Sequence, residues 1–153
     1  MNNPLITIVT VCYNSEKTIK DTIESVINQT YENIEYILVD GASKDNTVDI
    51  IKSYEEQFKD KGISYKWISE PDKGIYDAMN KGIDMASGEW VNFMNSGDIF
   101  YNNTIILDIF KEEMDNDIDV IYGNTEYDYG NFKKIRMSLG LNKIKEKMIF
   151  CHQ

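Results

Sequence analysis

The sequence has 153 residues, of which 42% are hydrophobic and 12% aromatic, so we expect one folded domain over residues 1–153 and no extensive disorder. Its 16 Lys and Arg residues against 26 Asp and Glu residues give a formal net charge of −10. That charge repels the phosphates of nucleic acids and excludes them as a main partner. A phosphorylated small substrate would need a divalent cation to offset the same repulsion.

Cysteine usage and the hydropathy pattern bear on where the protein is found. Cys12 and Cys151 lie far apart in the chain and lack zinc-type or redox-type spacing, which favours a reducing compartment. Residues 1–14 lack a basic start and a cleavage site, and no run approaches the roughly 20 apolar residues of a membrane span. We therefore expect a cytoplasmic protein. Peripheral association with the inner face of the membrane would have to come from segments outside this sequence.

Apolar runs alternate with amphipathic stretches through the first hundred residues, which is typical of a parallel sheet with connecting helices. The runs predict strands at 5–12, 34–39, 63–69 and 89–94. Helices are expected after a cap at Asn14 or Ser15, from 45–47 to 58, from 74 to 85, and around 103–114. Further strands are expected around 118–123 and 125–136. The predicted fold is an α/β, three-layer α/β/α sandwich with a Rossmann-like, mostly parallel sheet.

The periodicity also predicts which side chains are buried. The strand at 5–12 is expected at the centre of the sheet, and the strand containing Trp90, Val91 and Phe93 is expected to be buried too. The inner face of the first helix is predicted to carry Ile19, Ile23, Val26 and Ile27. That of the second helix is predicted to carry Val48, Ile51 and Tyr54, and that of the third helix Ile75, Ala78, Met79, Gly82 and Ile83.

The sequence closes on "MIFCHQ", an apolar segment without the polar ending that chain termini usually have. This ending leads us to expect a fragment of a longer chain, truncated on its C-terminal side.

Polar residues at strand ends are the first candidates for a site, because ligands of open α/β sheets bind at the carboxyl ends of the strands. Asp40 follows the second strand and can accept hydrogen bonds from a base or ribose; it can equally close the strand before a helix cap at Ser43 or Asp45. After the first strand, Tyr13 and the backbone near Thr10 and Val11 can form a base pocket or simply pack.

Two later motifs offer charged or metal-binding groups. Lys73 precedes a helix start, where it can help to hold an anion, and Asp77 and Asn80 share a face of that helix; a solvated turn is the alternative. Asn95-Ser96-Gly97-Asp98 is composed of turn-forming residues, but Asp98 can also supply a carboxylate oxygen to Mg²⁺ or Mn²⁺.

Several other chemistries lack support in the sequence. The single histidine, His152, cannot form a Cys/His metal site or serve a hydrolase triad, and no Gly-x-Ser-x-Gly elbow is present. The first strand leads into "CYNSEKT" where phosphate-binding loops would place glycines.

Two blocks together resemble the family 2 glycosyltransferases with the GT-A fold over residues 5–100. "ITIVTVCYNSEKTIKDTIESVINQTYENIEYILVDGASKDNT" is similar to the family's opening, and "EPDKGIYDAMNKGIDMASGEWVNFMNSGD" is similar to its Gly-x-x-x-Ala-x-Asn-x-Gly helix and acidic turn. The resemblance implies transfer of a sugar from a nucleotide diphosphate sugar to an acceptor hydroxyl, with inversion, in polysaccharide or glycoconjugate biosynthesis. It favours a UDP-sugar donor and a saccharide or lipid-linked acceptor.

The resemblance also assigns roles to individual residues. It implies that Asp98 holds the Mg²⁺ or Mn²⁺ cofactor on the diphosphate. The implied nucleotide-sugar-binding residues are Thr10, Val11, Tyr13, Asp40, Lys73, Asp77, Asn80, Asn95 and Ser96. Many relatives read Asp-x-Asp-Asp where this chain reads Asn95-Ser96-Gly97-Asp98, so one carboxylate remains at the turn.

The general base that inverting relatives need is not identified, since nothing in the spacing of Asp128 or His152 marks either residue. The alternative function is therefore a nucleotide-sugar-binding module without turnover. A receiver-like signalling domain would need an acidic pair where this chain has Tyr13-Asn14, and a nucleotidyltransferase would need a basic, glycine-rich loop after the first strand.

Overall fold

A computed structural model describes residues 3–111, 120–121 and 123–137 of the chain. The chain divides into two compact units, Met1–Glu113 and Met114–Gln153, and each is described by itself. The expectation of one domain over residues 1–153 stays a prediction.

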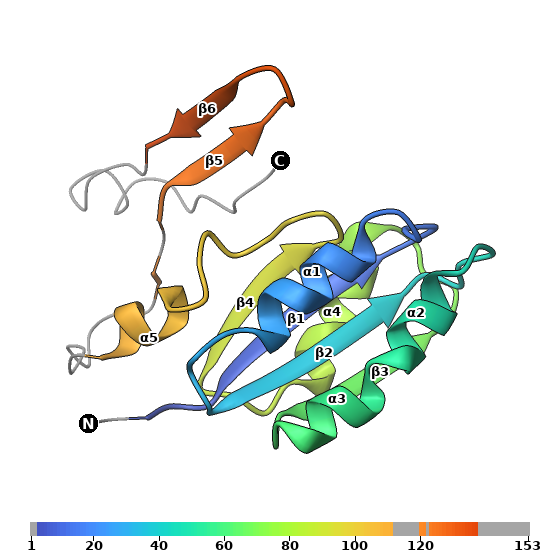
Figure 1. Cartoon of the computed structure of the whole chain (residues 1–153). Helices are drawn as coiled ribbons and strands as arrows, with labels where there is room; N and C mark the ends of the chain where they lie inside the picture. Colours follow the sequence, from blue (N-terminus) through green and yellow to red (C-terminus); the bar gives the residue numbers. More distant parts are fainter. Residues whose placement is uncertain (1–2, 112–119, 122, 138–153) are drawn as a thin grey trace. The chain divides into compact units, whose positions relative to one another are not determined.

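The first unit is built around a four-stranded parallel sheet with the strand order β3-β2-β1-β4 (Figure 1). Its strands are β1 (Ile6–Cys12), β2 (Ile34–Asp40), β3 (Ser64–Ser69) and β4 (Trp90–Asn95). Its helices are α1 (Ile19–Ile27), α2 (Thr47–Ser53), α3 (Glu55–Asp60), α4 (Ile75–Met85) and α5 (Ile105–Phe110). β1 lies inside the sheet, between β2 and β4, as predicted.

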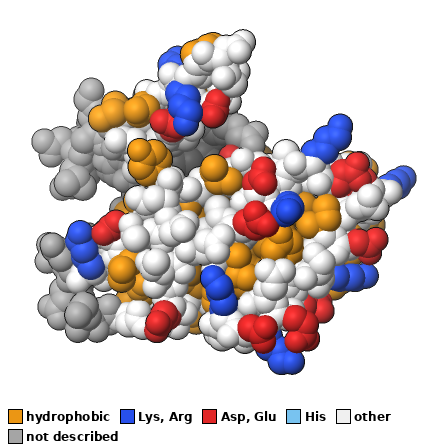
Figure 2. Space-filling view, in the orientation of Figure 1, with side chains coloured by type: hydrophobic (Ala, Val, Ile, Leu, Met, Phe, Trp, Pro, Cys, Tyr) orange, Lys and Arg blue, Asp and Glu red, His pale blue; other side chains and the backbone are white. Residues whose placement is uncertain are grey.

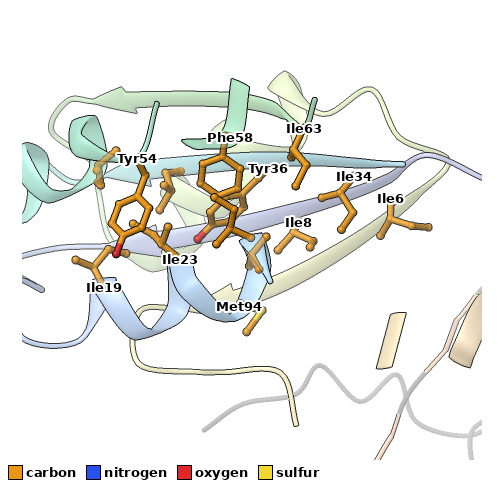
Figure 3. Close-up of a cluster of buried hydrophobic side chains, with 14 of the residues drawn as sticks. Ile6, Ile8, Ile19, Ile23, Ile34, Tyr36, Tyr54, Phe58, Ile63 and Met94 are labelled. Atoms are coloured by element: carbon orange, nitrogen blue, oxygen red, sulfur yellow. The ribbon is translucent and has the colours of Figure 1, made fainter. Parts of the chain in front are cut away.

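Two hydrophobic cores, one on each face of the sheet, confirm the three-layer architecture. On one face, Ile8 and Tyr36 pack with residues of α1, α2 and α3 such as Ile23 and Phe58 (Figure 3). On the other face, the core contains Ala78 of α4 together with four residues of β1 and β2: Val9, Val11, Ile37 and Val39. Successive residues of a strand point to opposite faces, so the unbroken apolar run of β1 serves both cores.

The first two helices differ from the prediction in their ends. α1 begins at Ile19 rather than directly after Asn14 or Ser15, and Thr18 at its cap makes no side-chain capping bond. The cap prediction was wrong because both side chains have other partners: Asn14 accepts a hydrogen bond from the Lys44 N–H, and the Ser15 hydroxyl donates to the Tyr13 carbonyl. The second predicted helix divides at Tyr54 into α2 and α3.

Three predicted inward-facing residues are more exposed than expected. Val48 is half-buried, while Thr47 of the same helix is buried. Ile75 and Ile83 of α4 are 43% and 48% exposed. A narrow stripe containing Ala78 and Gly82 makes the buried contact of α4, and a methyl group at Gly82 would lie 2.3 Å from Cγ1 of Val9, so the helix backbone packs close to the sheet.

The expectation of a buried fourth strand was also wrong for most of its residues. β4 is the edge of the described sheet, with Val91 42% and Phe93 37% exposed, and only Met94 is buried. The cause is the position of α4, which packs on β1 and β2 and leaves the same face of β4 uncovered.

The second unit contains an antiparallel hairpin of β5 (Thr125–Asp128) and β6 (Lys133–Arg136). Gly130 in its turn has φ 78°, a conformation that glycine adopts without strain. The strand expected over 125–136 is therefore two strands joined by a turn. Of the strand expected at 118–123, residues 118, 119 and 122 lie outside the described residues, and 120, 121 and 123 are not in a strand.

A buried carboxylate, that of Glu35 in β2, ties the end of α4 to the sheet. Its oxygens accept hydrogen bonds from the Thr7 hydroxyl at 2.6 Å, from the Ser87 N–H at 2.7 Å and from the Ser87 hydroxyl at 2.8 Å. Lys66 forms an ion pair with it at 2.5 Å. Burial favours the neutral acid, but the hydrogen bonds from Lys66, Thr7 and Ser87 outweigh it and lower the pKa of Glu35 to about 2.

The first prediction concerns Glu35→Gln. Because the folded state lowers this pKa, the carboxylate stabilises the fold above the unfolded pKa near 4.5, and that stabilisation is lost as the pH falls toward 2. The shift corresponds to about 3 kcal/mol. We expect Glu35→Gln to lower the free energy of unfolding by about that amount at pH 7 and to flatten its decline below pH 4.5, measured by urea denaturation. The matched control is Glu56→Gln, whose carboxylate is 81% exposed; an equal loss in the control would contradict the prediction.

Candidate functional site

The carboxyl ends of the four parallel strands lie side by side and form one edge of the sheet, which we call the carboxyl rim: Cys12, Asp40, Ser69 and Asn95. Asp40 pairs with both Cys12 and Ser69, and Asn95 pairs with Val11. β1 leads through α1 to β2 on one side, while β4 lies on its other side, so the chain order reverses between β1 and β4. Open α/β sheets bind ligands at such a reversal.

The loops that follow β1 and β2 are fastened to each other at the carboxyl rim. The Asn14 N–H donates to the Ser43 hydroxyl at 2.7 Å, and the Ser15 N–H donates to the Thr47 hydroxyl at 2.7 Å. Asn14 has φ 49°, a left-handed conformation that asparagine tolerates better than most residues. These contacts hold the chain on either side of Asn14 against the start of α2.

Asp45 reinforces the same connection from the β2 loop. Its carboxylate accepts hydrogen bonds from the Thr47 N–H at 3.0 Å and from the Glu16 N–H at 3.1 Å. Desolvation opposes ionisation, but the bonds from Thr47 and Glu16 lower the pKa of Asp45. Asp45 thus stabilises the loop as a carboxylate and accepts from the first N–H of α2. The cap residue of α2 is Asn46 rather than the predicted Ser43 or Asp45, and it makes no side-chain capping bond.

The Asp40 side chain is fully buried, with no exposed surface. Its carboxylate accepts hydrogen bonds from the Ser43 N–H at 2.9 Å, from the Ser43 hydroxyl and from the Ser69 hydroxyl at 2.6 Å. Cys12 lies 3.7 Å from the same carboxylate, and burial together with the charge of Asp40 raises the pKa of this thiol, which keeps it protonated. In this geometry Asp40 shapes the rim; its predicted contact with a base or ribose stays a prediction.

The three predicted residues of the first strand and its loop lie in different environments. Thr10 is fully buried, and its hydroxyl accepts a hydrogen bond from Tyr36 at 3.0 Å. Val11 is also buried, and its carbonyl accepts from the Ser96 N–H at 3.2 Å. Tyr13 is 58% exposed, so it alone of the three presents a side chain at the surface of the rim.

The turn from Asn95 to Asp98 is closed by two hydrogen bonds. The Asp98 N–H donates to the Asn95 carbonyl at 3.0 Å, and the Asp98 carboxylate accepts from the Asn95 N–H at 3.0 Å. Gly97 has φ 102°, as the third residue of a type II turn requires. The sequence "NSGD" is therefore a well-formed turn, and it also places the exposed Asp98 at the carboxyl rim.

Two threonines of the chain around α1 fix this turn in place. The Thr18 and Ser96 hydroxyls lie 2.9 Å apart, and the Gly97 N–H donates to the Thr22 hydroxyl at 2.8 Å. Sequence analysis did not select either threonine, because nothing in their spacing links them to a turn some 75 residues later. Their contribution becomes visible only when α1 packs beside β4.

The loop from Glu70 to Gly74 is held between β2 and α4. The Glu70 N–H donates to the Asp40 carbonyl at 3.0 Å, while Lys81 of α4 donates to the Pro71 carbonyl at 2.9 Å and pairs with the Glu70 carboxylate at 2.9 Å. The hydrogen bond with Glu70 is the main reason that the pKa of Lys81 is raised. The loop is thus anchored at the carboxyl rim.

The predicted residues of this loop and helix have separate surroundings. The Lys73 side chain is exposed, and its backbone N–H donates to the Asp77 carboxylate at 3.0 Å. The Asp77 carboxylate also lies 3.8 Å from the Lys81 ammonium, while the cap residue of α4 is Gly74. Asn80 is exposed farther along the same helix. No base was predicted; of the two polar residues considered for that role, Asp128 belongs to the second unit and His152 lies outside the described residues.

The donor atoms of the 95–98 turn are compatible with a weakly held hard cation. Within residues 3–111, 120–121 and 123–137, no three His, Cys, Asp or Glu side chains cluster as a protein-only metal site. The Asn95 side-chain oxygen is buried without a hydrogen-bond partner in this part of the chain, and Asp98 adds an exposed carboxylate two residues beyond Ser96. Mg²⁺ characteristically takes one or two protein oxygens and completes its shell with water and phosphate, which this turn can accommodate.

The structure is similar to solved glycosyltransferases and has the GT-A fold. It matches the mannosyltransferase PcManGT from Pyrobaculum calidifontis, solved with GDP-Man and Mn2+, with a TM-score of 0.66 at 22% identity over 72% of this chain and 32% of that one. It also matches S. aureus TarS residues 1–349, solved with UDP, with a TM-score of 0.58 at 26% identity over 69% of this chain and 31% of that one.

Sequence comparison places the chain in a family. The model for glycosyl transferase family 2 matches residues 7–152, so the chain belongs to that family. A PGL/p-HBAD biosynthesis glycosyltransferase of Mycobacterium bovis is 28% identical over all of this chain and 59% of its own length. Glycosyltransferase GlyG of Streptococcus pneumoniae is 35% identical over 84% of this chain and 42% of its own. The chain therefore spans three-fifths or less of these relatives.

The second prediction tests whether Asp40 acts by holding the rim together. Replacing it by Ala empties a fully buried position and removes the acceptor of the Ser43 N–H and of the part-buried Ser43 and Ser69 hydroxyls. A donor left without an acceptor destabilises a fold by about 1–3 kcal/mol where water cannot replace the lost bond. We expect Asp40→Ala to lower the free energy of unfolding by about 3 kcal/mol, measured by urea denaturation at pH 7. The exposed Asp84→Asn is the control and should stay within about 0.5 kcal/mol of the parent chain. Unchanged stability in Asp40→Ala would show that the carboxylate has no structural role.

Proposed function

We propose that this chain forms the donor-binding part of a glycosyltransferase that uses a nucleotide diphosphate sugar, with UDP as the favoured nucleotide. The observation that carries the proposal is the convergence of the β1, β2, β3 and β4 loops on one rim, where the buried Asn95 side-chain oxygen has no hydrogen-bond partner among the described residues and belongs to the same turn as the exposed Asp98. The complexes of the similar structures with GDP-Man and Mn2+ and with UDP support the choice of ligand.

Each group of the rim has a separate task in this proposal. Tyr13 presents an exposed ring on which a base can stack. Asp40 holds the β2 loop from inside, and the Thr18 and Thr22 contacts hold the 95–98 turn. Lys73, Asp77 and Asn80 border the donor on the side of α4, and Ser96 lies beside the diphosphate.

Asp98 and the Asn95 side-chain oxygen would hold Mg²⁺ or Mn²⁺. A divalent cation bound there supplies charge neutralisation for the diphosphate of the donor and for the leaving nucleoside diphosphate. The turn itself contributes a fixed position for these oxygens, since its backbone is bonded both internally and to α1. This arrangement also lets a chain of net charge −10 bind an anion.

The reaction exchanges one bond at the anomeric carbon for another. The bond from that carbon to the diphosphate oxygen breaks, the bond to the acceptor hydroxyl oxygen forms, and the hydroxyl proton passes to a base. An inverting reaction, a hexosyl donor and a saccharide or lipid-linked acceptor belong to the proposal. No base is assigned among the described residues.

No helix in the described part of the chain is both long and apolar enough to cross a bilayer.

The third prediction concerns metal-dependent nucleotide binding. Calorimetric titration should show UDP or GDP binding that is strengthened by Mn²⁺. Asp98→Asn should reduce that strengthening about tenfold, which corresponds to roughly 1.4 kcal/mol, because one anionic ligand is lost while the amide oxygen can still accept from Asn95. Asp84→Asn, an exposed carboxylate in the last turn of α4, is the control and should bind like the parent chain.

The outcomes of this titration separate the candidate functions. Absence of UDP and GDP binding with and without Mn²⁺ would refute the proposed function. Binding accompanied by hydrolysis or transfer of the matching nucleotide sugar supports a glycosyltransferase. Binding without either reaction supports the alternative, a nucleotide-sugar-binding module.

A further inference from the structure

The carboxylate of Asp72 lies directly over the backbone of Gly41 at the carboxyl rim. A methyl group added at Gly41 would be 2.5 Å from Oδ2 of Asp72 and 3.4 Å from Cδ2 of Tyr13. The Asp72 oxygen and the Tyr13 ring therefore flank the same short piece of backbone. Any larger residue at position 41 would take the space that the carboxylate occupies.

The two oxygens of Asp72 differ in their hydrogen bonding. Oδ1 accepts from the Gly74 N–H at 2.8 Å, which closes the turn before α4. Within the part of the chain that the structure describes, Oδ2 accepts no hydrogen bond, and the residue is only half-buried. One oxygen therefore fixes the side chain while the other remains available beside Tyr13.

Asp72 cannot move freely, because its loop is anchored at two places. The Glu70 N–H is bonded to the Asp40 carbonyl of β2, and Lys81 of α4 is bonded to the Pro71 carbonyl. Asp40 itself is fully buried with its carboxylate occupied by Ser43 and Ser69. Asp72 is thus better placed than Asp40 to offer an acceptor to a ligand.

We propose that Oδ2 of Asp72 reads the nucleobase of the donor by accepting a hydrogen bond from a ring N–H while the base stacks on Tyr13. This inference rests on the proposed function. Uracil carries such a group at N3 and guanine carries one at N1, whereas N3 of cytosine is itself an acceptor. A site built around a fixed acceptor rejects a ligand that cannot donate to it, because the carboxylate then loses water without gaining a partner.

The test compares nucleoside diphosphates that differ at this edge. UDP, GDP and CDP are titrated with Mn²⁺ into the parent chain and into Asp72→Asn, and the tighter of UDP and GDP is compared with CDP. We expect the parent chain to disfavour CDP by about 10- to 100-fold, the range for a hydrogen bond to a charged group. In Asp72→Asn the preference should collapse, since the amide can donate to N3 of cytosine and still accept from Gly74.

Gly41→Ala offers a second variant that leaves Asp72 in the sequence. Gly41 does not have a left-handed φ, so alanine fits the backbone, but its methyl group would displace the Asp72 carboxylate. We expect the same loss of base preference. Asp98→Asn serves as a contrast, because it should weaken UDP, GDP and CDP alike and leave their ratios unchanged.

The possible failures are distinguishable. If the parent chain binds UDP or GDP and its preference over CDP is the same in Asp72→Asn and Gly41→Ala, the assignment of Asp72 is overturned while the proposed function stands. If the parent chain binds none of the three nucleotides with Mn²⁺, the proposed function fails and this inference fails with it.

Discussion

The in-register parallel pairing of β1 with β2 and β4 is the constraint on which the whole site depends. It sets Cys12 opposite Asp40 and Val11 opposite Asn95, so that three loops leave the sheet at one edge. Because side chains alternate between faces, a shift of β2 by one residue would turn the Asp40 carboxylate toward α4 and away from Ser43 and Ser69. The two hydrophobic cores oppose such a shift, since it would expose Tyr36 and its neighbours on the wrong face. The strength of the cores thus protects the geometry of the rim.

Several carboxylates near the rim accept hydrogen bonds within the protein, which would lessen the repulsion that the proposed anionic donor meets there. Asp40 is bonded by two serines, Asp45 by Thr47 and Glu16, and Asp77 by the Lys73 N–H. Elsewhere, on the face seen in Figure 2, acidic and basic side chains are interspersed. Among the described residues at the rim, Asp72, Asp77 and Asp98 each keep one carboxylate oxygen that accepts no hydrogen bond.

Sequence patterns predicted the elements that hydrophobic periodicity determines, and failed where tertiary packing decides. The four strands from Ile6 to Asn95 were found close to their predicted bounds, and the resemblance identified the family correctly. The helices matched less well: α1 begins later, the second predicted helix is divided, and α5 is shorter than expected. The burial of Val91 and Phe93 was wrong because an apolar edge strand and an apolar central strand have the same sequence pattern. The full burial of Asp40 was likewise invisible, since it depends on Ser69, a partner in another strand. The proximity of Asp72 to Gly41 joins two loops that are adjacent only in the folded sheet.

Among the described residues the Asn95 side-chain oxygen has no hydrogen-bond donor, and this bears on whether residues 95–98 form only a turn. A buried acceptor without a donor destabilises a fold by about 1–3 kcal/mol, and a turn that merely reversed the chain would be more stable without it. The surrounding backbone is nonetheless rigidly held, by the mutual bonds of Asn95 and Asp98 and by the bond from Gly97 to Thr22. An unsatisfied polar atom held in a fixed position by a hydrogen-bonded backbone is expected where a protein keeps a ligand site preorganised. A cation at this turn would satisfy the Asn95 oxygen and use the Asp98 charge together, which a plain turn has no means to do.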